Sequence, residues 1–149
     1  MHFTVLQANF SKALNQVSRV VGTRTTLPVL NNILISAKKG KIILSATDLE
    51  VAVTALAIGK IEEEGELTVP ARLLTDFVSN NRDESVEFST KNTTLTLKSE
   101  HFKVNINGIS AEEFPTVPEL PKELFCEINK EDFADAIKKT IIATANDET

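Results

Sequence analysis

Apolar residues recur at helical spacing in three segments of the chain, which predicts three helices that each have one apolar face. Asn9 precedes the first of them as an expected N-cap, and Gly22 follows it as an expected end. The apolar positions are Phe10, Ala13, Leu14, Val17 and Val21 in the first segment, Leu74, Phe77 and Val78 in the second, and Phe133, Ala136 and Ile137 in the third.

The three segments are copies of one pattern, because the second and third lie 64 and 123 residues after the first. Thr4-Val5 before the first helix returns as Thr68-Val69 before the second. Two strand-length segments within 41–60 follow the first helix. Segments with period-two alternation, such as 93–99 and 101–107, follow the second, and this alternation is typical of strands with one buried face. The repeat predicts β-α-β-β-β units that begin near residues 2, 66 and 124.

These patterns predict an α+β fold in which an antiparallel sheet carries two helices on one side. We expect a first domain over residues 1–122, made of units at about 1–63 and 64–109 and of a linker at 110–122. An extended linker is expected there because the stretch carries three prolines and several acidic residues. Residues 123–149 are expected to hold one strand and one helix of a second, incomplete domain.

Charge is divided unevenly along the chain, whose formal net charge is −5. Residues 1–47 hold six lysines or arginines and no acidic residue, whereas the remaining residues carry a net charge of −11. The outward face of the first predicted helix bears Lys12, Asn15, Gln16 and Arg19. Such side chains suit phosphate oxygens, which require charge and hydrogen-bond donors but carry no base sequence. A solvated helix face has a similar composition, so charge alone leaves that alternative open.

The other two helices offer weaker candidates for the same contact. Arg72 falls on the face that corresponds to Lys12 and is expected to point toward phosphate. Asp76 takes the place of Lys12 in this register, which makes the second helix less suitable for an anion. In the third helix, Lys138 and Lys139 are the candidates.

Residues that carry out chemistry are sparse. The single cysteine, Cys126, excludes an internal disulfide, and His2 and His101 stand apart in the sequence, so neither a metal nor a cofactor is expected. Asp48 and Glu50 in the segment TDLE are interpreted as solvated acids of a turn, because no third ligand or histidine accompanies them. The sequence has no glycine-rich phosphate loop or nucleophile elbow, so no catalytic residue is predicted.

Neither a signal peptide nor a membrane span is indicated by the sequence. The N-terminus does not join a basic region to an apolar stretch, and no apolar run reaches the length that a bilayer requires. A soluble, cytoplasmic protein without membrane contact is expected.

Several motifs are similar to those of the bacterial sliding clamp, the β subunit of DNA polymerase III. They are Phe3-Thr-Val, VSRVVGTRTTLPVLNNILI at 17–35, ATDLE at 46–50, VPAR at 69–72 and Phe114-Pro115. The resemblance implies the DNA clamp fold, in which each chain has three such domains and two chains pair head to tail in a ring around duplex DNA. Only the first domain and the start of the second are matched, so an N-terminal fragment is expected.

The resemblance also implies a function, that of a non-catalytic processivity factor. The ring would encircle duplex DNA without sequence preference and tether the replicative polymerase, whose holoenzyme carries the nucleotidyltransferase activity. The clamp loader and other clamp-binding proteins are the further partners implied, together with a homodimer. Arg24 is the expected DNA contact in a loop at the ring's edge. The expected dimer-interface residues, all in the strand at 101–107, are Phe102, Lys103, Val104 and Ile106.

The segment TTLPVLNNILI at 25–35 is expected to lead from the first helix into a sheet strand. Pro28 would then lie where the sheet needs no backbone donor. A structural role is expected for Leu27, Pro28, Val29 and Leu30.

Two other functions stay open from the sequence. One is a stand-alone protein-interaction module whose basic face is merely solvated. The other is a small hydrolase or transferase with dispersed catalytic residues. Neither explains the repeat and the motifs together.

Overall fold

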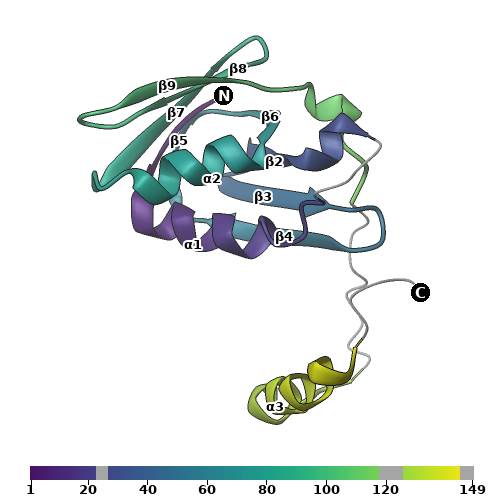
Figure 1. The fold of residues 1–149 in the computed structure, drawn as a ribbon. Helices are drawn as coiled ribbons and strands as arrows, with labels where there is room; N and C mark the ends of the chain where they lie inside the picture. Colours follow the sequence, from purple (N-terminus) through teal and green to yellow (C-terminus); the bar gives the residue numbers. More distant parts are fainter. Residues whose placement is uncertain (23–26, 118–125, 145–149) are drawn as a thin grey trace. The chain divides into compact units, whose positions relative to one another are not determined.

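The computed structural model describes residues 1–22, 27–117 and 126–144, and its contacts divide the chain into two compact units, Met1–Val117 and Pro118–Thr149. In its described part, the first unit folds into two antiparallel sheets and two helices (Figure 1). The predicted α+β class is therefore confirmed. The predicted boundary at residue 122 lies outside the described residues. No helix in the described ranges is long and apolar enough to cross a membrane.

Each half of the first unit begins with a strand that runs directly into a helix and then returns as further strands. The first half consists of β1 (His2–Leu6), α1 (Gln7–Val17), the 3-10 helix η1 (Pro28–Asn31), β2 (Asn32–Lys38), β3 (Lys41–Thr47), β4 (Ala52–Ala57) and β5 (Gly59–Glu63). The second half consists of β6 (Gly65–Pro70), α2 (Ala71–Asn80), β7 (Ser85–Lys91), β8 (Thr94–Lys98), β9 (Lys103–Asn107) and the 3-10 helix η2 (Ala111–Glu113).

Both sheets are built from strands of both halves. Within the described residues, one sheet has the strand order β5-β1-β7-β8-β9 and the other the order β4-β3-β2-β6. In the first sheet Phe3 of β1 pairs with Phe88 of β7, and in the second Ile33 of β2 pairs with Val69 of β6. The first half supplies β1 and β5 to the sheet of β7, β8 and β9, and the second half supplies β6 to the sheet of β2, β3 and β4. The two halves therefore fold together around one main core.

Strand β5 was not predicted, because the β-α-β-β-β unit has three strands after its helix, whereas β2, β3, β4 and β5 all follow α1. Gly59 lies in the strand opposite Val5 of β1. A Cβ atom at this position would lie 2.5 Å from the carbonyl oxygen of Thr4 and 2.5 Å from Cγ1 of Val5. The glycine therefore allows β5 to approach β1 closely rather than permitting a special backbone angle.

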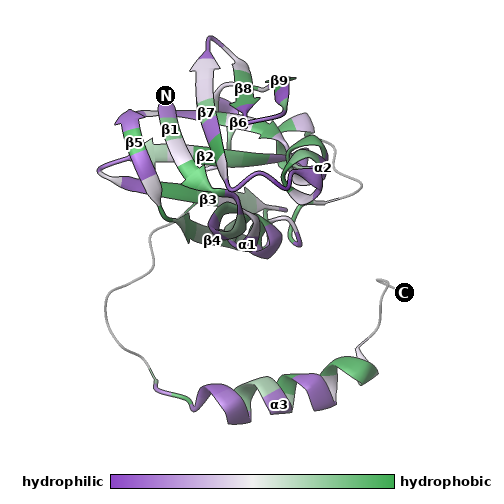
Figure 2. Cartoon of the chain, turned by 90° about the vertical axis from the view of Figure 1, so that its left-hand side faces the viewer, coloured by the Kyte–Doolittle hydropathy of each residue, from purple (hydrophilic) through white to green (hydrophobic). Residues whose placement is uncertain are grey.

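A stack of three phenylalanines joins α1 to the five-stranded sheet. The ring centroids of Phe3 and Phe88 are 4.6 Å apart, and those of Phe10 and Phe88 are 4.5 Å apart. All three side chains are buried. The predicted apolar stripe of α1 is confirmed, since Ala13, Leu14 and Val17 are buried as well. Figure 2 shows this green face of α1 turned toward the sheets and its purple face turned away.

The predicted ends of α1 are wrong at both termini. The helix begins at Gln7, directly after β1, and its N-cap is Leu6 rather than Asn9. The backbone N–H of Gln7 donates to the carbonyl oxygen of Glu84 at 2.9 Å. This tertiary hydrogen bond satisfies one of the free N–H groups at the start of the helix, which a capping side chain would otherwise satisfy. The helix ends at Val17, before the expected end at Gly22.

The segment from Leu27 to Ile35 begins with a 3-10 helix at Pro28, not with the predicted strand. Pro28 stands in the first turn, where a missing N–H costs nothing. The expected structural role is confirmed for Val29 and Leu30, which are buried against Phe114. The motif residues around 28 and 114 therefore pack together and fix the chain where it leaves the second half.

Asn32 opens β2 and links it to β6 through a buried polar chain. Its Nδ2 donates to Oγ1 of Thr68 at 3.1 Å, and that hydroxyl donates to the carbonyl oxygen of Ile109 at 2.8 Å. Asn32 and Thr68 are both buried. A buried amide is stable only when its donors find acceptors, so this chain explains a polar residue within an apolar run.

The second unit contains α3 (Lys130–Thr140) and the 3-10 helix η3 (Ile141–Ala143) in its described part. The side chain of Asn129 caps α3 by accepting hydrogen bonds from the backbone N–H groups of Glu131 and Asp132. The third predicted helix is thus confirmed. The predicted strand before it is absent from residues 126–129, which form no regular element, and its start lies outside the described residues.

Replacing Phe88 with alanine tests the importance of the aromatic stack. We expect the free energy of unfolding to fall by about 3–5 kcal/mol, because a buried ring is lost between two others. Phe102→Ala is the matched control, since the side chain of Phe102 is 55% exposed and its loss should cost about 0.5 kcal/mol or less. Urea denaturation followed by circular dichroism measures both. Similar losses in the two variants would contradict the role given to Phe88.

Candidate nucleic-acid interface

The outward face of α1 forms an open, polar groove. Its volume is about 630 Å³, and it is lined by Ala8, Ser11, Lys12, Asn15, Gln16 and Arg19. The structure thus brings together the candidates that the sequence placed on this helix. The packing of Phe10 on the opposite side turns this face to solvent.

The two cations of the α1 groove are available for a ligand. In the described part of the chain, no ion pair within 4.0 Å joins Lys12 or Arg19 to an acidic residue. The groove also contains no carboxylate of its own. Amide and hydroxyl groups beside two free cations provide hydrogen-bond donors for an anion such as phosphate.

Helix α2 packs beside α1 and supplies the next candidate, Arg72 (Figure 1). Arg72 lines a second depression of about 670 Å³ together with Ser18 and Asn31. Asp76 also lines this depression, and its Oδ2 lies 3.9 Å from Nε of Arg72. Because the pair is exposed, it is weak, but it reduces the positive potential that Arg72 offers.

The remaining cationic candidates lie outside the described part of the first unit. Arg24 lies outside the described residues. Lys138 and Lys139 belong to α3 in the second unit, where Nζ of Lys139 lies 2.7 Å from Oδ2 of Asp135. Their roles stay predictions.

Strand β9 is the last strand of the five-stranded sheet. It carries three of the four residues predicted for a dimer interface, and the fourth, Phe102, directly precedes it. Phe102 and Val104 are 55% and 38% exposed, and they line an apolar pocket of about 190 Å³ with Phe77 of α2. Lys103 is exposed. Ile106 is only 3% exposed and lies in the core, so its side chain does not reach the surface with the others.

Asp48 serves as a turn residue, as the sequence suggested. Its Oδ1 accepts hydrogen bonds from the backbone N–H groups of Val51 at 2.7 Å and Glu50 at 3.0 Å. The hydrogen bond from Val51 is the main cause of the lowered pKa of this carboxyl group. The carboxylate is thus occupied in closing the turn between β3 and β4.

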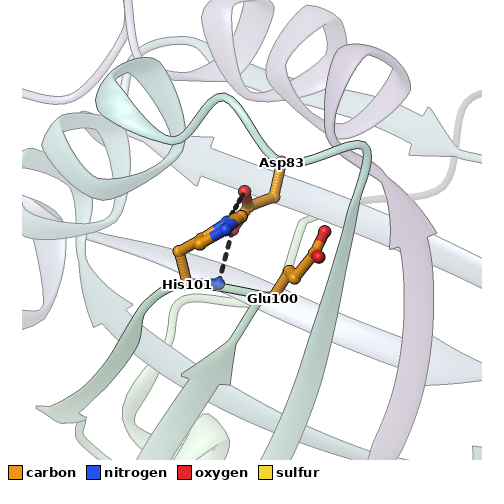
Figure 3. A group of neighbouring side chains, drawn as sticks. All are labelled: Asp83, Glu100 and His101. Atoms are coloured by element: carbon orange, nitrogen blue, oxygen red, sulfur yellow. Dashed lines mark hydrogen bonds and ion pairs between the residues drawn. The ribbon is translucent and has the colours of Figure 1, made fainter.

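One cluster of side chains was not predicted from the sequence. Asp83 follows α2, whereas Glu100 and His101 lie in the turn between β8 and β9, and Figure 3 shows the three side chains side by side. Hydrogen bonds from Ser99 and then from His101 lower the pKa of Asp83 to about 2. The hydrogen bond to Asp83 raises the pKa of His101. Asp83 and His101 are 18 positions apart and belong to no recognisable sequence motif, so the cluster becomes evident only from the fold.

Comparison with known proteins gives a consistent family. Residues 1–118 match the family described as DNA polymerase III beta subunit, N-terminal domain. The chain is 32% identical to the beta sliding clamp of Pseudomonas putida and 32% identical to that of Synechococcus elongatus. The aligned region covers 99% and 100% of this chain, but 41% and 40% of these relatives. The chain therefore spans about two fifths of their length.

Solved structures agree with the sequence matches. A putative DNA polymerase III beta subunit from Eubacterium rectale superposes with a TM-score of 0.93 at 29% identity, covering 100% of this chain and 41% of that one. The DNA polymerase III subunit beta from Pseudomonas aeruginosa superposes with a TM-score of 0.88 at 31% identity, with the same coverage. The chain belongs to the family of the DNA polymerase III beta subunit, the beta sliding clamp, and carries its N-terminal domain.

Proposed function

We propose that this chain acts in DNA replication as the first domain of a sliding clamp, which encircles duplex DNA and tethers the replicative polymerase. The observation that carries the proposal is the groove along α1, where Lys12 of the helix and Arg19 of the following turn have no acidic partner among the described residues. Because the chain belongs to the family of the DNA polymerase III beta subunit, the ligand proposed for this face is duplex DNA.

The contact with DNA would depend on phosphate charge and not on base sequence. The α1 face offers cations and amide groups, which position a protein on phosphate but distinguish no base. Weak contacts suffice in a ring, because a closed ring cannot leave the side of a duplex, and weak contacts also permit sliding. A clamp of this kind needs no catalytic residue, so the chain would be a non-catalytic accessory subunit.

Strand β9 would serve the ring by pairing with a strand of another clamp domain. Its place at the end of the sheet leaves one edge of backbone donors and acceptors for a partner. The apolar pocket at Phe102 and Val104 would bury side chains beside that strand, and Lys103 would lie at its margin. Ile106 would contribute through its main chain.

Arg24 enters the proposal through the resemblance to the family, which places it in a DNA-contacting loop, whereas Lys138 and Lys139 enter it as the cations of the third repeated helix. The polymerase, the clamp loader and other clamp-binding proteins enter it in the same way, as partners of the full-length ring. Cytoplasmic location follows from this function.

Salt dependence tests the α1 face. The chain should bind a fluorescent duplex weakly and equally for unrelated base sequences, and a double change of Lys12→Gln with Arg19→Gln should reduce the slope of log K against log salt by about 1.8. The reason is the loss of two phosphate contacts. The charge-matched control is Lys41→Gln with Lys91→Gln, which removes two exposed lysines of the sheets. An equal change of slope in the control would contradict a specific role for α1.

Asp76→Asn should strengthen DNA binding. The change removes a carboxylate beside Arg72 and frees that side chain from its ion pair. Since exposed pairs are worth about 0.2–1 kcal/mol, we expect affinity at low salt to rise by about 1.4-fold to 5-fold. Asp132→Asn, which changes the net charge equally on α3, should have a smaller effect in the same anisotropy assay. Unchanged or weaker binding by the Asp76 variant would argue against Arg72 as a contact.

The edge of β9 should mediate weak self-association of this chain at high concentration. Val104→Asp should lower the association constant by at least about tenfold, because an unpaired carboxylate would be buried in the apolar contact. Leu56→Asp is the control, since Leu56 is 59% exposed on β4 at the edge of the other sheet. Sedimentation velocity over a concentration series measures both variants. Association that is lost in the Leu56 variant and kept in the Val104 variant would overturn the assignment of the edge.

A further inference from the structure

Asp83, Glu100 and His101 form a group of potential metal ligands away from the α1 face. One carboxylate or imidazole atom from each side chain lies within 4.8 Å of the others (Figure 3). The three come from two separate segments, the loop after α2 and the turn between β8 and β9. An ion bound here would therefore join two parts of the chain that are distant in sequence.

The central ligand, Asp83, is already held in place. Its Oδ2 accepts the backbone N–H of His101 at 3.0 Å, and its Oδ1 lies 2.7 Å from Nδ1 of His101. The side chain of Asp83 is 10% exposed, whereas that of His101 is 66% exposed. A fixed, ionised carboxylate beside a movable imidazole lowers the entropic cost of forming a chelate.

The cluster also carries an excess of negative charge. Among the described residues, no lysine or arginine lies within ion-pair distance of Asp83 or Glu100. Two carboxylates therefore face a single imidazole, and the Glu100 carboxylate is exposed. A neutral imidazole does not offset the repulsion between the Asp83 and Glu100 carboxylates, whereas a bound dication would.

The donor set indicates which class of ion fits. One imidazole nitrogen with two carboxylate oxygens suits Zn²⁺ and similar first-row ions, whereas Mg²⁺ and Ca²⁺ prefer oxygen ligands throughout. Ligands of a tetrahedral Zn²⁺ stand about 3.4 Å apart, given metal–ligand distances near 2.1 Å. To reach that value, rotation of the exposed His101 side chain would have to widen the 2.7 Å separation between its Nδ1 and Oδ1 of Asp83. The ion takes the place of the hydrogen bond between Nδ1 and Oδ1.

We propose that Asp83, Glu100 and His101 bind one divalent first-row transition-metal ion of the Zn²⁺ class. Solvent completes the coordination, because the site is open. The ion ties the turn before β9 to the loop after α2. That turn leads into Phe102, whose ring centroid lies 6.5 Å from that of His101. Bound metal therefore restricts the motion of Phe102, which lines the apolar pocket beside β9.

His2 provides an internal comparison. It also lies between two carboxylates, with Nδ1 2.8 Å from Oε2 of Glu62 and Nε2 2.7 Å from Oε1 of Glu87. These carboxylates approach opposite nitrogens of the ring, so one ion cannot reach both while keeping an imidazole ligand. Each of the two histidines therefore has two carboxylates nearby, but only at His101 are the carboxylates placed so that one ion could contact all three side chains.

Calorimetric titration of the chelator-treated 149-residue chain with Zn²⁺ tests the proposal, together with thermal unfolding at several Zn²⁺ concentrations. We expect one ion per chain and a melting temperature that rises with Zn²⁺, because binding to the folded state stabilises it. Glu100→Gln should weaken binding at least about tenfold, and His101→Asn should weaken it further. The Glu100 side chain is exposed and forms no hydrogen bond or ion pair within the described residues, so its variant should retain the circular dichroism spectrum of the parent.

His2→Gln and Cys126→Ser are the matched controls, and both should keep the affinity of the parent chain. The cysteine is included because its exposed thiol is an alternative zinc ligand. The proposal is overturned if the parent chain takes up no Zn²⁺, if Glu100→Gln binds as tightly as the parent, or if binding is lost in either control.

Discussion

The packing of Phe10 against Phe88 is the contact on which the arrangement of the first unit depends. It fixes how α1 is rotated about its own axis, because the helix can place only one face against the sheets. Once Phe10, Leu14 and Val17 are buried, Lys12 and Gln16 must lie on the opposite side, and Arg19 follows in the turn after the helix. The position of the candidate DNA contacts is thus a consequence of core packing, and no additional interaction is required to orient them.

The charge distribution supports the same arrangement. The chain is acidic as a whole, yet its first 47 residues contain no acidic side chain, and α1 belongs to that part. A polyanion would be repelled by most of the surface and attracted by the α1 face. Asp76 on α2 shows that this separation is incomplete, since it lies beside Arg72 on the neighbouring helix.

Periodicity predicted the elements well, and long-range contacts explain where it did not. The buried stripe of α1 follows from spacing alone, but its start depends on the hydrogen bond between Gln7 and Glu84, which no local signal reveals. Two sheets formed where one was expected, because β1 and β6 exchange partners between the repeats. Ile106 was expected at the dimer interface from the resemblance to the family, yet its side chain is buried in the core. The cluster at Asp83 and His101 required the fold to bring two loops together.

The central claim is that the outward face of α1 meets duplex DNA. Titration of the isotopically labelled chain with a short duplex, followed by amide and side-chain nuclear magnetic resonance signals, tests this claim residue by residue. The account predicts shifts at Lys12, Gln16 and Arg19 that are the same for unrelated duplex sequences and vanish at high salt. Shifts confined to the strands, or shifts that depend on base sequence, would contradict it.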